Sequence, residues 1–578
     1  MTKVFRLFIV QILFIFSVMF LHKEKKMALT VMNPRMSTHK ITQAFKLDKE
    51  KKSNSEKSPQ VIIDESKEEI KMPPIEETIK LPQQKEEMKV PPLEEKTVTT
   101  KKTDSKILNY DLVGKKQNFD DTLFTDNYTE INGVLTFRGN QYRSAPSYGT
   151  VNIIDEAIIK KWEFTTSTSS WGGGAGWTGQ PAIIKWPEEI KSMMNLKPKY
   201  KQNKYFIEVI YASLDGNVYF FDLRTGQESR EKIKIGNPMK GSVAVDPRGY
   251  PLLYVGEGIP EKNTFGFGIY SLLDGKRLYH IKGNDNNAYR GWGAFDSSAL
   301  IHGESDTLVL GGENGMLYLV SLHTKFDKEK ETISVKPEIT NYRYKTTKRK
   351  SLGIENSVVA YKNLIYFADN SGYIQCFDMS KQHPVWIIDG KDDTDATLVL
   401  EVEEDTPYLY SGNEVDIQGT KGSSEVKKIN GLTGKVIWTK SYECQSQIGE
   451  HPVNGGMLGT PVIGKQSISD RIIINMARYK TFSGGLIVAL DKKTGDILWQ
   501  TEMKNYPWSS PVDVYTKDGK AYIIQCNSIG EVNLINAENG DILDTIKLNA
   551  NIESSPAIYK GFVVIATRGQ KMYGLKIK

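Results

Sequence analysis

The amino-acid sequence predicts an all-β fold, an eight-bladed β-propeller of four-stranded antiparallel blades, on three observations. A motif that leads from a polar loop into an apolar strand recurs at intervals of roughly 40 to 60 residues, the length of one such blade with its loops. A second motif, a glycine turn followed by a strand, recurs between these entries. The chain also ends one strand short of a complete blade. The eight entries begin at Gly179, Gly241, Ser297, Asn356, Ala396, Gly459, Ser509 and Ser554.

The clearest copy of the repeat is residues 484–512. It contains two runs of β-branched and aliphatic residues, Leu486–Leu490 and Asp496–Thr501, and the second run includes Trp499. The Lys-Thr-Gly turn between them suits a reversal with a positive φ at Gly495. Such a run, turn and run predicts two neighbouring strands of one blade. Similar turns end at Gly226, Gly434 and Gly540.

This repeat resembles that of the pyrroloquinoline-quinone-type propellers, the superfamily of quinoprotein alcohol dehydrogenases and of the propeller lipoprotein of bacterial outer-membrane assembly. The resemblance is carried by Ala489-Leu-Asp-Lys-Lys-Thr-Gly-Asp-Ile-Leu-Trp499 and extends over roughly 134–578. Phe137-Arg-Gly-Asn140, with Arg143, is similar to the lead-in segment of these proteins. Because sites are grafted onto folds, the resemblance predicts the fold far more strongly than the function.

The composition sets aside a nucleic-acid partner. The chain of 578 residues is 39% hydrophobic and carries a net charge of only +6, spread over both signs. No basic stripe interleaved with aromatic residues occurs in the sequence.

Residues 1–22 predict a membrane segment. Leu7–Leu21 is apolar apart from two polar residues, and Lys3 and Arg6 precede it. Because charged rather than small residues follow the run, we expect an uncleaved anchor, with the bulk of the chain outside the cytoplasmic membrane. Secretion after cleavage of a signal peptide is the alternative.

Residues 23–106 predict a disordered linker, since this stretch is rich in Lys, Glu and Pro and too poor in apolar residues to offset its ordering entropy. A nine-residue repeat begins at Lys71, Lys80 and Lys89, and its prolines favour an extended, semi-stiff spacer. Residues 107–157 then predict a lead-in segment that docks on the propeller, which we place at 158–578.

The strand patterns at the start and at the end of the propeller are complementary, because one end has an extra strand and the other lacks one. Trp162 lies in a strand-like run that has no blade before it, whereas the last copy contains only three runs: Pro556–Tyr559, Phe562–Ala566 and Lys571–Ile577. We therefore expect the Trp162 strand to complete the last blade and close the ring.

The three cysteines, Cys376, Cys444 and Cys526, are odd in number and far apart. They form no metal, redox or haem motif, so we interpret them as small core residues.

The unusual residues gather on one predicted face. In an up-and-down blade, the loop that enters the innermost strand and the turn between the second and third strands lie on the same side. Tryptophans, acids, amides and arginines are frequent in these loops and predict a concave ligand-binding mouth. The candidate ligand-binding residues are Trp171, Trp177, Arg290, Trp292, Asp296, Glu355, Asn356, Asp395, Asn454, Arg478, Trp508, Glu553 and Arg568.

The same residues have a structural interpretation. The tryptophans could wedge between blades, and the carboxylates could cap loops through backbone N–H groups. Trp162, Trp386, Trp438 and Trp499 occupy equivalent positions in outer strands and predict packing. No metal site is expected, because the three acids within 392–395 do not make the twelve-residue calcium loop.

Two main functions follow from these patterns. The first is a non-catalytic, extracytoplasmic, membrane-tethered module that holds an envelope protein or glycan on this face, without a cofactor. The second, implied by the resemblance, is a dehydrogenase of alcohols or sugars that uses the quinone and Ca²⁺, with Glu355, Asn356 and Asp395 at its centre. The chain lacks the adjacent cysteines that such enzymes place over the quinone. A third possibility is a hydrolase with an acidic pair, although no pair stands out. We expect the binding module.

Overall fold

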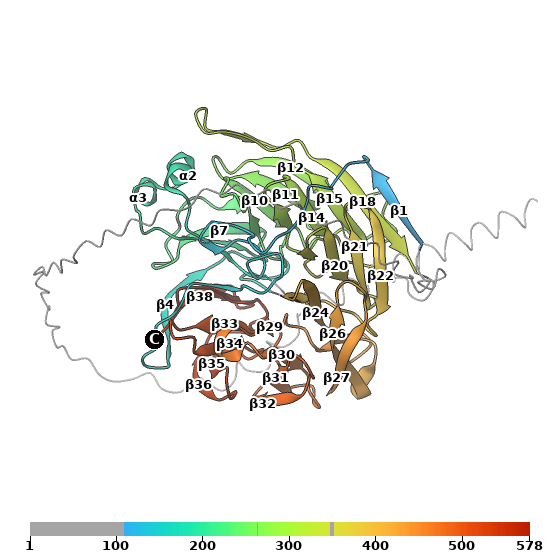
Figure 1. Ribbon diagram of the computed structural model, residues 1–578. Helices are drawn as coiled ribbons and strands as arrows, with labels where there is room; N and C mark the ends of the chain where they lie inside the picture. Colours follow the sequence, from blue (N-terminus) through green and yellow to red (C-terminus); the bar gives the residue numbers. More distant parts are fainter. Residues whose placement is uncertain (1–108, 177–178, 263, 347–351) are drawn as a thin grey trace, which may run out of the picture. The chain divides into compact units, whose positions relative to one another are not determined.

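The computed structural model describes residues 109–176, 179–262, 264–346 and 352–578. They form one small two-stranded sheet and eight larger, mainly antiparallel sheets that follow one another as the blades of a propeller, which confirms the predicted fold class and blade number (Figure 1). The predicted membrane segment, 1–22, and linker, 23–106, lie outside the described residues, as does Trp177. Within the described ranges, no helix is both long and apolar enough to cross a membrane.

The first four blades begin at the first four predicted entries. Blade 1 comprises β2 (Gly133–Val134), β5 (Ala182–Ile184), β6 (Glu208–Ala212), β7 (Asn217–Asp222) and β8 (Ile233–Lys234). Blade 2 comprises β9 (Ala244–Val245), β10 (Leu252–Gly256), β11 (Gly266–Ser271) and β12 (Arg277–Lys282). Blade 3 comprises β13 (Leu300–His302), β14 (Thr307–Gly311), β15 (Met316–Ser321), β18 (Glu338–Lys345) and, outermost, β1 (Asn109–Gly114). Blade 4 comprises β19 (Val359–Tyr361), β20 (Leu364–Ala368), β21 (Tyr373–Asp378) and β22 (His383–Asp389).

The other four blades begin at the remaining entries. Blade 5 comprises β23 (Val399–Glu403), β24 (Thr406–Gly412), β26 (Gly422–Asn430) and β27 (Val436–Cys444). Blade 6 comprises β29 (Val462–Ile463), β30 (Arg471–Ala477), β31 (Gly485–Asp491) and β32 (Ile497–Met503), extended by β25 (Glu414–Val415) and β28 (Gly455–Gly456). Blade 7 comprises β33 (Val512–Tyr515), β34 (Ala521–Cys526), β35 (Glu531–Asn536) and β36 (Ile542–Lys547). Blade 8 comprises β3 (Ser147–Tyr148), β37 (Ala557–Tyr559), β38 (Phe562–Thr567), β39 (Lys571–Ile577) and β4 (Ile158–Thr165).

Short insertions interrupt this plan. The helices α2 (Glu188–Met193) and α3 (Pro198–Lys201) lie between β5 and β6 in blade 1. The hairpin of β16 (Lys325–Asp327) and β17 (Thr332–Ser334) lies between β15 and β18. Two 3-10 turns, η1 (Gly419–Lys421) and η2 (Gln466–Ile468), complete the elements.

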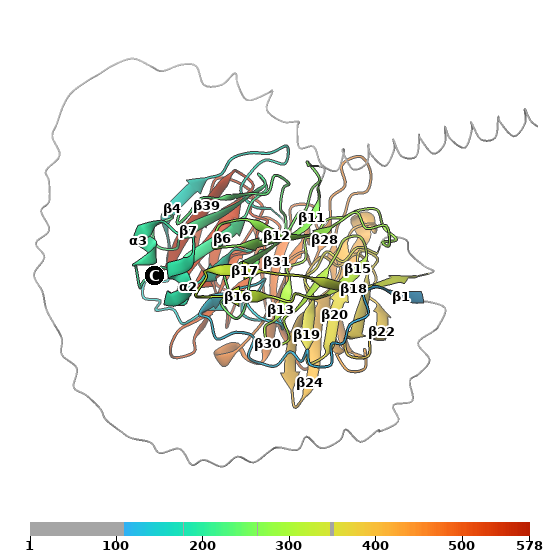
Figure 2. The same cartoon turned by 90° about the horizontal axis from the view of Figure 1, so that it is seen from above.

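The ring closes through the strand that contains Trp162, as predicted. Strand β4 pairs antiparallel with β39, with Ile158 opposite Ile577 and Thr165 opposite Lys571. Figure 2 shows the two labelled strands side by side, the early one in cyan and the late one in red. The last blade therefore gains its outer strand from residues made long before it, which removes an open sheet edge.

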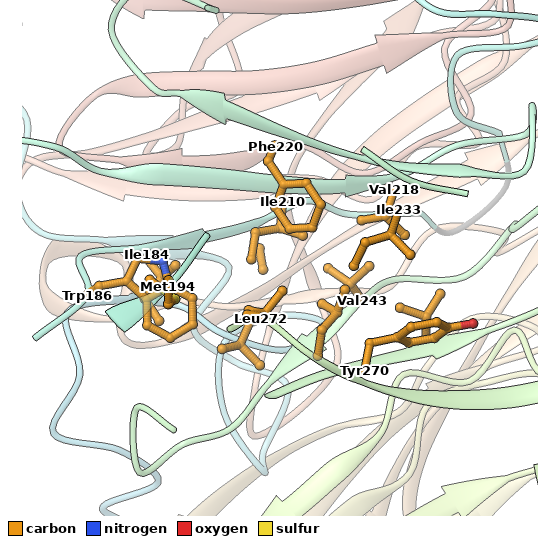
Figure 3. Close-up of a cluster of buried hydrophobic side chains, with 14 of the residues drawn as sticks. Ile184, Trp186, Met194, Ile210, Val218, Phe220, Ile233, Val243, Tyr270 and Leu272 are labelled. Carbon is orange, nitrogen blue, oxygen red and sulfur yellow. The ribbon is translucent and has the colours of Figure 1, made fainter. Parts of the chain in front are cut away.

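Apolar clusters join each blade to the next. One cluster lies between blades 1 and 2, where Ile184, Phe220 and Leu272 meet (Figure 3). Equivalent clusters lie at all the remaining junctions between neighbouring blades. At the junction of blades 8 and 1, Trp162 and Met572 pack against Val209. The core is thus a closed series of interblade layers. The three cysteines lie buried in the strands β21, β27 and β34, as core residues.

The outer-strand tryptophans pack as predicted, and they also join blades. The indole N–H of Trp438 in blade 5 donates to the carbonyl of Lys492 in blade 6, at 3.0 Å. The ring lies against Gly495, where a Cβ atom would come within 2.8 Å of the indole. Trp162, Trp386 and Trp499 each donate in the same way to the following blade. Two features therefore favour glycine at position 495. Its φ of 73° is a backbone conformation that other residues rarely adopt, and the indole of Trp438 leaves no room for a side chain.

One turn of the lead-in segment, residues 137–145, lies at the centre of the ring, where the innermost strands converge. Arg138 donates to the carbonyls of Pro461 and Pro511, in blades 6 and 7. Arg143 donates to the carbonyls of Ser298 and Val358, in blades 3 and 4. Both guanidinium groups are fully buried, and burial lowers the pKa of each to about 10. The two arginines therefore connect strands from four blades.

Candidate functional site

The loops predicted to share one face do meet. The indole N–H of Trp292, from the loop before β13, donates to Glu313 in the turn after β14, at 2.6 Å. The amide of Asn454, from the loop before β29, donates to Glu414 in the turn after β24, at 2.9 Å. Contacts between the two kinds of loop therefore form in both halves of the ring. We call this side of the propeller the tryptophan face.

The first group of charges on this face surrounds a lysine. The ammonium of Lys240, in blade 2, pairs with Asp296 and lies 3.7 Å from Glu313, both in blade 3. Burial alone would lower the pKa of Lys240, but Asp296, Glu313 and Glu355 raise it above its ordinary value. Lys240 therefore stays a cation among these carboxylates. We call these four residues the lysine cluster.

An amide links the lysine cluster to the next blades. Arg290 donates to the side-chain oxygen of Asn370, at 2.9 Å. The amide nitrogen of Asn370 donates to Glu355 at 2.7 Å and to Asp393 at 3.2 Å. One amide nitrogen thus donates hydrogen bonds to two carboxylates that come from neighbouring blades.

A second acidic group lies beyond this amide. Asp393 and Asp395 come from the loop before β23, and Glu414 and Asp416 follow β24. Burial, followed by the neighbouring carboxylates, raises the pKa values of Asp393 and Asp395 well above their ordinary range. Burial also raises the pKa of Glu414, to about 8. We call these four residues the blade 5 carboxylates.

Several oxygens of the blade 5 carboxylates lack a hydrogen-bond donor. One oxygen each of Asp393, Asp395 and Glu414 is sealed from solvent and receives no N–H or hydroxyl donor, and the carboxyl groups of Asp395 and Glu414 lie within hydrogen-bond reach of each other. No lysine or arginine in the described ranges forms an ion pair with these three residues or with Asp416. In a low-dielectric setting, such carboxylates hold protons or await a cation.

A third group lies where blades 8 and 1 meet. The guanidinium of Arg568 lies 5.9 Å from the ring centre of Trp171, a cation–π distance, and 3.7 Å from Glu553. Glu553 also accepts from the amide of Asn551, at 2.8 Å. The indole of Trp171 is partly exposed here, as are those of Trp292 and Trp508 elsewhere on the face.

Two of the predicted residues serve the fold. The amide of Asn356 donates to the carbonyls of Ala368 and Thr394 and accepts from the N–H of Ala368. Both its N–H donors and its oxygen therefore bond to backbone groups inside the blades. Arg478 donates to the carbonyls of Asn454 and Phe482, and so fixes a loop.

Lys240 was not among the residues predicted from the sequence. It directly precedes Gly241, the second motif entry, and so belongs to the same class of loop as Trp292 and Asp395. Its position was thus readable from the repeat. Its charge gave no reason to choose it from the 76 lysines and arginines of the chain.

The residues fit poorly the quinone and Ca²⁺ that the resemblance implies. Asp296, Glu313 and Glu355 are the described group of three carboxylates close enough to share a metal ion, and the ammonium of Lys240 already pairs with Asp296 and lies beside Glu313. The side-chain amide of Asn356 already bonds to backbone groups of the blades. The three cysteines lie in different blades, so no pair of adjacent cysteines can cover a quinone.

The opposite side of the ring also has hollows. One cavity of about 440 Å³ is lined by lead-in residues together with Arg248 and His302. Another, of about 820 Å³, lies between the lead-in segment and the turn that contains Lys517. None of the predicted ligand-binding residues that the structure describes lines these two cavities.

Comparisons with known proteins agree on the fold. A family model described as outer membrane protein assembly factor BamB matches residues 483–578. A quinohemoprotein alcohol dehydrogenase, ADHIIG from Pseudomonas putida HK5, is 11% identical with a TM-score of 0.51, and the match covers 77% of this chain and 80% of that one. BamB from Moraxella catarrhalis is 15% identical with a TM-score of 0.43, over 64% of this chain and 93% of that one. No curated protein matches the sequence.

Proposed function

We propose that this chain, which is a β-propeller of the pyrroloquinoline-quinone type, is a non-catalytic binding module that holds a protein partner on its tryptophan face. The observation that carries the proposal is the composition of that face. Trp171, Trp292 and Trp508 are partly exposed on it, Trp171 lies near the guanidinium of Arg568, and Trp292 donates to the buried Glu313. Aromatic anchors beside desolvated charges are the residues that dominate the energy of protein interfaces.

The centre of the ring supports a docking surface rather than a channel. The turn of the lead-in segment that contains Arg138 and Arg143 fills the position where the innermost strands converge. A partner that enters from the tryptophan face therefore meets a rigid floor. Pre-organised floors of this kind reduce the entropy that is lost on binding.

The proposed setting is the cell envelope. The family model that matches residues 483–578 describes an outer-membrane assembly factor, which favours an envelope protein as the partner. We extend the proposal to a single-pass tether through residues 1–22, which would hold the propeller outside the cytoplasmic membrane, with secretion after cleavage as the alternative.

The quinone-dependent dehydrogenase is the second candidate, since its fold is shared with ADHIIG. Its test is direct. The purified protein is mixed with the quinone and Ca²⁺, and bound quinone is measured by absorbance after gel filtration. Stoichiometric, Ca²⁺-dependent binding of the quinone would favour the dehydrogenase over the non-catalytic binding module. We expect none, because Asn356 and the cysteines are committed to the fold.

The binding module is tested by partner capture. Trp171→Ala and Trp292→Ala are compared with Ile154→Ala, which removes a side chain that is 77% exposed in the lead-in segment. The immobilised proteins are incubated with detergent-solubilised envelope, and the partner they retain is identified and titrated. Each tryptophan variant should bind the partner about 30-fold more weakly, the equivalent of ~2 kcal/mol, and Ile154→Ala should bind it normally. Equal capture by all the variants, at unchanged melting temperatures, would refute the proposal.

A further inference from the structure

The outer strands of blades 5, 6 and 7 begin with exposed aliphatic residues. These strands are β27, β32 and β36, and they follow one another along the lower margin of the propeller in Figure 1. Each of the residues concerned is 37–52% exposed. We call this set the aliphatic rim: Val436 and Ile437 in β27, Ile497 and Leu498 in β32, and Ile542 in β36.

The aliphatic rim lies at a β-bulge that other blades protect. In blades 5, 6 and 7, one extra residue is inserted in the outer strand at this point, and blades 2, 4 and 8 have the same insertion. The residue just before the insertion is charged or proline in those three blades: Arg277, Pro384 and Lys160. Charged residues and proline at a sheet edge keep it from joining another protein. The aliphatic residues of blades 5, 6 and 7 favour such joining instead.

Contacts between neighbouring blades make the aliphatic rim one continuous surface. Lys440 in β27 pairs with Asp496, the residue directly before the exposed pair of blade 6, at 2.9 Å. Thr501 in β32 donates to the carbonyl of Gly540, two residues before the exposed residue of blade 7, at 2.7 Å. The apolar residues therefore follow one another over three blades. Contiguous exposed apolar surface of this kind marks an interaction site.

The charges at the two ends of the aliphatic rim are opposite in sign. Lys435 directly precedes the exposed pair of blade 5, and Asp541 holds the same position in blade 7; both are exposed. A twofold axis beside blade 6 and parallel to the ring axis places blade 5 of one copy opposite blade 7 of the other. It also keeps the two rims at the same height. Lys435 of each copy then faces Asp541 of the other.

We propose that a second copy of this chain docks on the aliphatic rim, with blade 5 of each copy against blade 7 of the other. A twofold interface uses the same patch twice, so both the apolar contact and the lysine–aspartate contact are repeated. The outer strands begin on the side opposite the tryptophan face, because successive antiparallel connections alternate between the two sides. The dimer therefore leaves the tryptophan face free, and this inference does not depend on the proposed function.

The test cross-links the full-length protein through one introduced cysteine. The three native cysteines are buried, so a short bismaleimide reaches the introduced thiol first. Ile497→Cys lies beside the proposed axis and should give a covalent species of twice the chain's mass on a denaturing gel. Lys160→Cys, at the equivalent bulge of blade 8, should keep the mass of one chain. Absence of the doubled species, equal yields from both variants, or a conjugate with a different protein would overturn the proposal.

A lysine tests the apolar contact. Adding Leu498→Lys to Ile497→Cys copies Lys161, which blade 8 carries at the same bulge, so the fold should be retained. The cross-linked yield should fall about tenfold, because an unpaired charge would be buried in the interface. Circular dichroism checks that the variant is folded. An unchanged yield would show that the rim is not in contact and would refute the proposal.

A second pair of variants tests which blades face each other. Lys435→Cys and Asp541→Cys place thiols at the two ends of the aliphatic rim. Neither variant should cross-link to itself, whereas an equal mixture of the two should give the doubled species. Cross-linking of Lys435→Cys to itself would place blade 5 against blade 5 and overturn the arrangement, as would a mixture that gives no doubled species.

Discussion

Glu414 shows how one residue can make the stability of the propeller depend on pH. Its carboxyl group is buried beside other acids, and its pKa is raised to about 8. The native state therefore keeps a proton that the unfolded chain loses near its ordinary pKa of about 4.3. Since the native state binds more protons in this window, the free energy of unfolding falls as the pH rises from about 4 to 8.

We expect Glu414→Gln to weaken this dependence. The amide cannot ionise, so the variant should lose less stability between pH 6 and pH 9, by up to about 1.4 kcal/mol for each pH unit that Glu414 alone titrates. Melting temperatures of the wild type, this variant and the control Glu404→Gln, which alters an exposed acid in the turn between β23 and β24, are measured across that range. Parallel curves for all three would show that Glu414 does not titrate there.

Single residues were the hardest feature to predict from the sequence. The repeat placed Trp292, Glu355 and Asp395 in the right class of loop, but it could not separate Asn356, whose amide is spent on backbone groups, from residues that face the mouth. That distinction depends on where each amide finds its partner. Only tertiary structure supplies that information.

The turn glycines decide how neighbouring blades fit at the scale of elements. Gly495 and Gly275 occupy equivalent turns in blades 6 and 2, with φ angles of 73° and 76°. A Cβ at Gly495 would meet Trp438 at 2.8 Å, whereas at Gly275 the nearest atom is 3.7 Å away. Both turns therefore need a residue that tolerates a positive φ, but only the turn at Gly495 has an indole packed against it.

This pair isolates the contribution of the interblade tryptophan. Gly275→Ala should cost about 1–2 kcal/mol, because alanine must adopt a left-handed conformation. Gly495→Ala should cost a further 1–3 kcal/mol or so, because the methyl group also displaces the indole. Chemical denaturation of both variants gives the difference. An equal loss would mean that the indole can move aside at no cost.

Strands were predicted well where they repeat and missed where they do not. Residues 571–577 form β39 as predicted, and Gly485–Asp491 extends its predicted strand by one residue at each end. By contrast, β1, the hairpin of β16 and β17, and the pair β25 and β28 were not anticipated. These strands add to sheet edges or form outside the repeat, so no periodic pattern marks them.

The ring as a whole depends on the arginines at its centre. The side chain of Arg143 donates to the carbonyls of Phe137, Ser298 and Val358 and to the hydroxyl of Thr136. It thereby joins the lead-in segment to two blades. Without it, several buried acceptors would lose their donor.

We expect Arg143→Met to destabilise the whole propeller rather than one blade. Each orphaned buried acceptor costs about 1–3 kcal/mol, so the loss should be 3 kcal/mol or more, with a single unfolding transition at a lower temperature. Calorimetry of this variant and of Arg277→Met, which alters an exposed arginine, provides the comparison. A second, separate unfolding transition would show that some blades unfold independently and are not stabilised by the arginines at the centre of the ring.

The architecture was the most predictable feature, because eight entries in register determine it together. The central position of Arg138 and Arg143 could not be predicted, because a buried arginine that donates to backbone carbonyls looks the same in the sequence as an exposed one. The lead-in segment was expected to dock, but its β2 and β3 join blades 1 and 8 directly.

The pairing of β4 with β39 sets the order in which the protein can be completed. Ribosomes produce the first of these strands some four hundred residues before the second. Until β39 has been translated, the nascent chain keeps two unsatisfied edges that can join neighbouring polypeptides. Every product that terminates before this strand keeps them permanently. Ring closure thus reports that β39 has been made, and chains cut short before it present an exposed strand that chaperones and proteases can recognise.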